Sequence, residues 1–204
     1  RLATVTLVVD GSPTVAGQSH SLMQGGSLPI TVTGADPEGG ALTFFIVTGP
    51  AHGDLSGAWP DLVYTPHAGY SAVDGFTFAA SDGRSVSAPA MVTLRVKPLL
   101  TVAWAAPAPL AYGSPLGASQ LNAAANVEGT FVYTPGAGTV LNAGAGQTLT
   151  ALFIPADPDY QPISIQATID VHQAQPAVFW AAPTPITYGT PLDASHLNAI
   201  ATAP

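Results

Sequence analysis

The chain has 204 residues, of which only 8% are charged, and its formal net charge is −8. Its four cations, Arg1, Arg84, Arg95 and Lys97, cannot neutralise a phosphate backbone, so the composition excludes nucleic acid and anionic lipid as partners. There is no cysteine, which excludes disulfides and thiolate metal sites, and a charge content this far below the typical level of about 25% indicates export, to the bacterial cell surface or beyond it.

Short apolar or alternating runs, bounded by Gly, Pro and Asp, recur along the whole chain, whereas a helical period of 3.6 residues is nowhere convincing. The sequence therefore predicts an all-β fold. The expected strands, in chain order, are Thr4–Val9, Leu28–Thr33, Ala41–Val47, Leu62–Thr65, Phe76–Ala80, Ala90–Val96, Phe131–Thr134, Leu149–Ile154 and Ile163–Val171. The longest apolar stretch, Leu99–Tyr112, contains two prolines and is too short to cross a bilayer, so no membrane span is expected within the chain.

The first residues resemble a strand that occurs later in the chain. The segment 3–9 reads ATVTLVV, and the segment 90–96 reads AMVTLRV. We therefore expect residues 1–10 to be the last strand of a preceding domain and its linker, followed by a complete domain at 11–97.

A long-period repeat occupies the second half of the chain. The windows 102–125 and 178–201 align without a gap and are identical at 16 of 24 positions, including Trp104 with Trp180. Copies separated by the length of a small domain are typical of tandem modules that each close their own core. The sequence thus predicts a second domain at 98–173 and the incomplete start of another copy at 174–204.

The segment 11–97 resembles a bacterial cadherin-like or immunoglobulin-like tandem module. The resemblance is carried by ADPEG at 35–39, TGPAHGDL at 48–55, YTP at 64–66, DGFTF at 74–78 and SDG at 81–83. The segment 98–173 resembles another bacterial immunoglobulin-like repeat, through Trp104, YGSPL at 112–116, QLNA at 120–123, FVYTP at 131–135 and DPDY at 157–160. Both resemblances imply tandem immunoglobulin-like β-sandwiches, and neither implies a catalytic activity.

The resemblance to cadherin-like modules also implies a candidate calcium site, because such modules often bind calcium at their junctions through carboxylates and carbonyls. Asp10 in the entry linker, Asp36 and Glu38 in one turn, and Asp82 in another are expected at one end of the first sandwich. The alternative is that these acids only form surface turns. No other cofactor is expected.

Catalytic patterns are weak, and we expect no enzyme. The tetrapeptide Gly53-Asp54-Leu55-Ser56 is similar to a serine-esterase block but has its last two residues in the wrong order, so a hairpin turn is expected there. The histidines stand too far apart in sequence for a typical zinc motif. They are His20, His52, His67, His172 and His196.

Each tryptophan has two possible roles, stacking against a sugar ring or packing against other protein side chains. Trp104 and Trp180 occupy the same place in both copies of the repeat. This favours packing, because every module must bury the apolar side chains of its own core. Trp59 lies between Gly57 and Pro60 outside any repeat, and is the better candidate for an exposed contact.

These patterns favour a structural stalk, filament or adhesive-array segment of a large bacterial extracellular protein, whose partners are neighbouring domains of the same array. One alternative is a module that binds glycan or another surface protein through Trp59 or Tyr70. A second is a set of accessory domains of an exported hydrolase. A third is a filament in which residues 1–9 and 174–204 pair between chains by strand addition.

Overall fold

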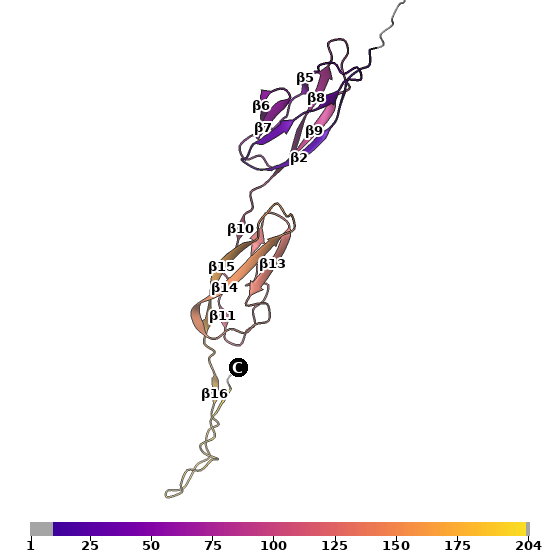
Figure 1. Cartoon of the computed structure of the whole chain (residues 1–204). Coiled ribbons are helices and arrows are strands. Elements are labelled where there is room, and N and C mark those ends of the chain that lie inside the picture. Colours follow the sequence, from indigo (N-terminus) through magenta and orange to yellow (C-terminus); the bar gives the residue numbers. More distant parts are fainter. Residues whose placement is uncertain (1–9, 203–204) are drawn as a thin grey trace, which may run out of the picture. The chain divides into compact units, whose positions relative to one another are not determined.

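The computed structural model describes residues 10–202, so the strand expected at Thr4–Val9 lies outside the described residues. The chain divides into two compact units, Arg1–Leu99 and Leu100–Pro204. All regular elements of the described residues are β-strands, which confirms the all-β prediction (Figure 1). Among residues 10–202, no helix is long and apolar enough to cross a membrane.

The first unit contains two main sheets. One has the order β2 (Gln18–Met23), β9 (Ala90–Lys97), β8 (Val73–Ser81) and β5 (Thr43–Thr48), and its β2 is parallel to β9. The other has the order β3 (Leu28–Thr31), β7 (Asp61–Pro66) and β6 (Gly53–Ala58), all antiparallel. A short pair, β1 (Thr14–Val15) with β4 (Gly34–Ala35), completes the unit.

The core of this unit is formed by side chains from both sheets. In β8 and β9 every second residue is buried, which directs Phe76, Phe78 and Leu94 inward. They meet Ile30 of β3 and Tyr64 of β7, which are 1% and 0% exposed. Each such apolar side chain contributes about 1.5–3 kcal/mol through removal from water. The unit is therefore a β-sandwich with a core of its own.

The second unit has one four-stranded sheet in the order β11 (Leu110–Ala111), β15 (Ile163–His172), β14 (Gly144–Pro155) and β13 (Gly129–Thr134). Here β11 is parallel to β15, as β2 is to β9. A short antiparallel pair, β10 (Val102–Ala103) with β12 (Ala124–Ala125), forms a separate two-stranded sheet. The core contains Leu116, Leu149 and Ile169, with Trp104 packed against it, which confirms packing for this tryptophan.

The repeat in the sequence is also a repeat in the structure. In β10 and β12, Val102 faces Ala125, and in β16 (Ala177–Phe179) and β17 (Ile200–Thr202), Val178 faces Ala201. These are the first and last positions of the two aligned windows, so both copies close the same strand pair in the same register.

The two copies differ in what covers them. Leu116 is 2% exposed because Leu149 and Ile169 of the sheet pack against it. Its counterpart Leu192 is 59% exposed. Several other apolar side chains of the second copy are exposed by more than half: Val178, Phe179, Trp180, Tyr188, Leu197 and Ile200. The second copy therefore has the same turns and strand register as the first, but the described residues do not bury its apolar face.

The strands expected between residues 10 and 202 all overlap observed strands, but several observed strands, among them β2 and β6, were not expected. The polar strand β2 was not expected, because its residues do not alternate with apolar ones. The expected turn at Gly53-Asp54-Leu55-Ser56 is wrong, since these residues begin β6 and pair with β7. A Cβ at position 53 would overlap the ring of Tyr64, so glycine allows β6 to approach the core.

Candidate functional site

Asp36 and Glu38, two of the four acids proposed as calcium ligands, accept hydrogen bonds from backbone amides near the start of the first unit. Asp36 Oδ1 accepts hydrogen bonds from the amides of Glu38 and Gly40, at 3.0 and 2.7 Å. Both carboxylate oxygens of Glu38 accept from the amide of Gly11, at 3.2 Å each. This turn is therefore closed by its own side chains and joined to the start of the unit.

The other two acids meet at Arg84. Asp82 Oδ1 accepts from the amides of Arg84 and Ser85, both at 2.7 Å, and these bonds hold the pKa of Asp82 below its usual value. Asp10 Oδ1 lies 3.3 Å from Arg84 Nη1, in an exposed ion pair. Within residues 10–202, no three acidic or histidine side chains gather closely enough to hold a metal. Calcium binding at these residues stays a hypothesis.

Asp74 is a buried carboxylate that sequence reasoning missed. It lies in β8 and is 7% exposed. Its oxygens accept hydrogen bonds from the amides of Ala51 and His52, both at 3.0 Å, and from the hydroxyl of Tyr64, at 2.7 Å. Asp74 thereby ties the loop before β6 and the centre of β7 to β8.

The electrostatics of this cluster follow from its hydrogen bonds. Burial alone would raise the pKa of Asp74, but the bonds from the Tyr64 hydroxyl and from the amides of Gly75, Ala51 and His52 outweigh it and lower the pKa below its ordinary value. Burial, and then the hydrogen bond to Asp74, raise the pKa of Tyr64. The pair is therefore an ionised carboxylate and a neutral phenol at neutral pH.

The histidines fill separate structural roles. The ring of His52 stacks on Tyr70 with a centroid distance of 4.3 Å. His67 lies 3.7 Å from Asp54 in an exposed pair, and His20 contacts Gln18 at 2.9 Å. His172 is an exposed residue at the end of β15. None of these contacts places a nucleophile beside a histidine.

A serine, a histidine and an aspartate do meet in the second copy of the repeat. Asp193 Oδ1 lies 2.6 Å from Ser195 Oγ and 2.7 Å from His196 Nδ1. In a catalytic triad the serine contacts one imidazole nitrogen and the carboxylate the other. Here both contact Nδ1, so the trio is a turn. In the first copy the same turn has Gly117, Ser119 and Gln120, which have no such chemistry.

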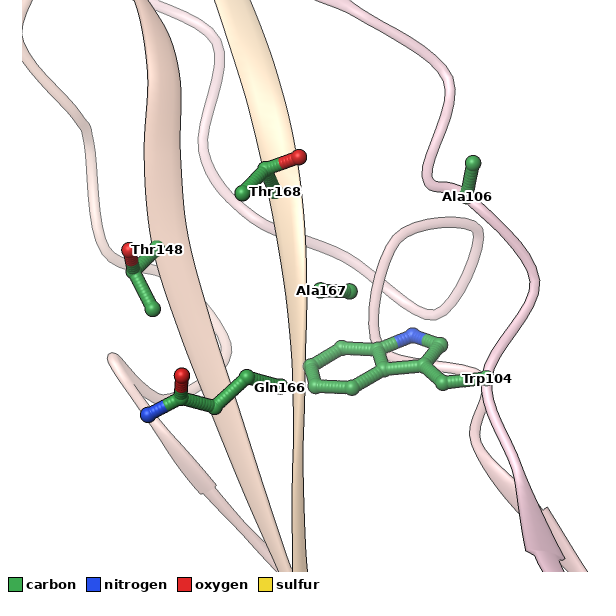
Figure 2. Close-up of a pocket in the computed structure, with 6 residues that line it drawn as sticks. All are labelled: Trp104, Ala106, Thr148, Gln166, Ala167 and Thr168. Carbon is green, nitrogen blue, oxygen red and sulfur yellow. The ribbon is translucent and has the colours of Figure 1, made fainter.

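Trp104 lines an open groove of about 330 Å³ in the second unit. The groove is also lined by Ala106, by Thr148 of β14, and by Gln166, Ala167 and Thr168 of β15. Figure 2 shows the indole lying beside the strand that carries Gln166 and Thr168, with Thr148 on the neighbouring strand. The indole Nε1 donates to the carbonyl of Gln120 at 2.9 Å, and the ring edge meets Tyr133 at a centroid distance of 5.4 Å.

Trp59 differs from expectation, and Trp180 differs from its counterpart Trp104 in exposure. Trp59 is half-buried against the core and stacks on Phe44 with a centroid distance of 6.1 Å, so its expected role as an exposed contact is not supported. Trp180 repeats the bond of Trp104, with Nε1 donating to the carbonyl of His196 at 3.2 Å, yet it is 57% exposed.

Comparisons with known proteins agree with this fold. Residues 10–95 match the family model described as a bacterial Ig domain. No curated protein matches the chain in sequence. Together with the two sandwich units, the family match identifies the fold as tandem immunoglobulin-like β-sandwiches.

Solved structures similar to this chain come from several classes of protein, and the chain spans only part of each of them. An endo-fucoidan hydrolase from glycoside hydrolase family 107 is 18% identical over 84% of this chain and 30% of its own, with a TM-score of 0.38. An I-band fragment of titin is 12% identical over 79% of this chain and 64% of its own, with a TM-score of 0.43. The N-terminal four Ig domains of Dscam1 are 10% identical over 85% of this chain and 49% of that chain, with a TM-score of 0.44.

Proposed function

We propose that this chain, whose residues 10–95 form a bacterial Ig domain, is a structural spacer in an extracellular or cell-surface bacterial protein. Its role in this proposal is to set the distance between the parts of a longer molecule, and it performs no catalysis. Its partners are neighbouring modules of the same kind.

The observation that carries this proposal is the repeated build of the segments 102–125 and 178–201. The two copies share a strand register, and a tryptophan in each donates to the carbonyl 16 residues further on. The two copies keep the same internal geometry, although Gln120 in the turn of the first copy is replaced by His196 in the second. This pattern favours selection for shape over selection for one reactive group.

The separate cores support the same role. The first unit is built around Tyr64 and Phe78, and the second around Leu149 and Ile169. Modules that bury their own cores can be repeated without redesign of their neighbours. Pro98 and Pro176 lie in the connecting segments, where a fixed φ restricts bending.

Small-angle X-ray scattering tests the proposal. A compact protein of this length would have a radius of gyration of about 17 Å. The long strand β15 has 10 residues and so spans about 34 Å, and two modules of about this length arranged end to end, as the spacer proposal requires, would have their centres about 40 Å apart. Two such modules, each with its own radius of about 12 Å, give a radius above about 23 Å for a spacer.

Scattering at several protein concentrations separates a spacer from a filament subunit. A spacer keeps the same radius of gyration and molecular mass at every concentration. A radius of about 17 Å, the compact value, would contradict the spacer role. A mass that rises with concentration would favour self-association by strand addition.

A further inference from the structure

The segment 178–201 has an apolar face that the described residues leave exposed. We call it the open face, and its members are Trp180, Ile186, Leu192 and Leu197, which correspond to Trp104, Leu110, Leu116 and Leu121 of the first copy. The side chains of the open face are between 46% and 60% exposed. Their counterparts all pack into the core of the second unit. Exposed apolar side chains that gather on one face are typical of an interaction surface.

These side chains share one face because the second copy reproduces the backbone of the first. The same turn bonds occur in both copies. They run from the amides of Ser114, Gln120 and Leu121 to the carbonyls of Ala111, Gly117 and Gly117, and from those of Thr190, His196 and Leu197 to those of Thr187, Asp193 and Asp193. The strand register and the tryptophan bond are also shared. The open face is therefore the surface that the first copy turns toward its core.

In the first copy this surface is covered by the inner face of a β-sheet. Leu149 of β14 and Ile169 of β15 form the core together with Leu116, and Leu141 packs against them from the loop before β14. Leu149 and Ile169 point inward because the buried positions alternate along both strands. The covering residues are distant in sequence from Leu116, so the contact is an interface between two separate segments.

Backbone groups take part in the same interface. The amide of Tyr112 donates to the carbonyl of His172, the last residue of β15, at 2.8 Å, and the amide of Leu116 donates to a carbonyl of the loop before β14, also at 2.8 Å. The corresponding amides of the second copy belong to Tyr188 and Leu192. Within residues 10–202 they make no backbone hydrogen bond. A partner that fits the open face must therefore supply carbonyls at a strand end and a loop, as well as apolar side chains.

We propose that the open face binds the β-sheet of a neighbouring module, and that this sheet is of the same kind as β14 and β15. Such a sheet presents leucine and isoleucine on its inner face and has a strand that can run parallel to residues 186–187, as β15 runs parallel to β11. Two open faces packed on each other would bury the apolar side chains but leave the amides of Tyr188 and Leu192 without acceptors, which is unfavourable for buried donors. The proposal rests on the spacer function, in which neighbouring modules are the partners, and names the surface that one of them contacts.

An extended chain tests this proposal. In it, the sequence of residues 126–173 follows Ala201 directly, as it follows Ala125 in the first copy. We expect nuclear Overhauser effects between the methyl groups of Leu192 and those of the appended Leu149 and Ile169, because Leu116 makes this contact in the first copy. Hydrogen exchange at the Leu192 amide should become slower than in the parent chain by about 100-fold or more, because exchange would then require opening of a folded module.

Two variants of the extension show whether the inner face of the sheet is responsible. Leu149→Asn with Ile169→Asn, made only in the appended copy, removes the apolar contacts and should return the Leu192 amide to the exchange rate of the parent chain. Thr148→Asn with Thr168→Asn in the appended copy is the matched control, since these exposed residues alternate with Leu149 and Ile169 and lie on the outer face. The control should keep the slow exchange.

Three results would overturn the proposal. The first is fast exchange at Leu192 in the extended chain, without methyl contacts to the appended sheet. The second is equal protection of Leu192 by the inner-face variant and the unchanged extension. The third is protection of Leu192 in the parent chain that increases with protein concentration, which would assign the open face to a second copy of the chain. Failure of the spacer function is distinguishable, because it is measured by scattering from the parent chain without any extension.

Discussion

Replacing Asp74 with asparagine should destabilise the first unit by about 2–4 kcal/mol. In the parent chain the carboxylate accepts bonds from two amides and from the Tyr64 hydroxyl while being only 7% exposed. An asparagine keeps the shape, but its NH₂ group must face one of these donors, which leaves buried donors unpaired. Hydrogen bonds to a charged acceptor contribute about 1.5–3 kcal/mol, and an unpaired buried donor costs about 1–3 kcal/mol.

The pH dependence of the same variant gives an independent check. The folded-state pKa of Asp74 lies below that of the unfolded chain, which is about 3.9. This group therefore contributes stability above the unfolded pKa, and the contribution is lost as the pH falls below about 4 through the folded pKa. The Asp74→Asn variant should lack this loss, so its stability difference from the parent should shrink in acid.

Urea unfolding, followed through the amide signals of β8 and β9, measures the first unit alone. The control is Asp54→Asn, because Asp54 is 84% exposed and only meets His67 at 3.7 Å. That change should alter the unfolding free energy by less than about 0.5 kcal/mol. Two results would contradict this reasoning. One is an equal unfolding free energy for Asp74→Asn and Asp54→Asn at neutral pH. The other is a difference in unfolding free energy between these variants that is as large in acid as at neutral pH.

Four further expectations can be measured on the same chain. Gly53→Ala should cost about 1–3 kcal/mol because its Cβ would overlap the Tyr64 ring, whereas Gly49→Ala, with no atom within 4 Å of the new Cβ, should be neutral or slightly stabilising in urea unfolding. Trp104→Ala should lower the stability of the second unit by about 3 kcal/mol in calorimetry, and an equal effect of Trp180→Ala would contradict the difference in their packing. Chymotrypsin should cut first between β16 and β17, where the apolar side chains are exposed, and a first cut elsewhere in the mass spectrum would contradict this. Millimolar calcium should leave the thermal midpoint equal to that in EDTA, since the four candidate carboxylates already hold amides or Arg84, and a clear rise with calcium would restore the metal hypothesis.

The strands that could be predicted are those whose own residues alternate. Phe76 and Phe78 in β8, and Val92 and Leu94 in β9, face the core at every second position. Strand β2 could not be found in this way, because its side chains are mostly polar. Its position is set by parallel pairing of Gln18–Met23 with β9, which joins residues far apart in the chain.

The candidate sites, like the strands, could be predicted from the sequence only in part. The position of Asp74 was open to prediction, because it shares the inward face of β8 with Phe76, and an acid on a buried face needs partners. Its actual partners are amides of a distant loop, which no local pattern reveals. Likewise, the acids of the calcium hypothesis are visible in the sequence, but the amides that occupy their oxygens are not.

The parallel pairing of β2 with β9, and of β11 with β15, determines how force would pass through each unit. A pull on the two ends of the first unit draws β2 and β9 in opposite directions along their shared axis, since the chain enters before Gln18 and leaves after Lys97. All six residue pairs of this contact are then loaded in shear at once, and must fail together. The corresponding contact in the second unit, β11 with β15, has only two pairs, so under tension the second unit should yield first.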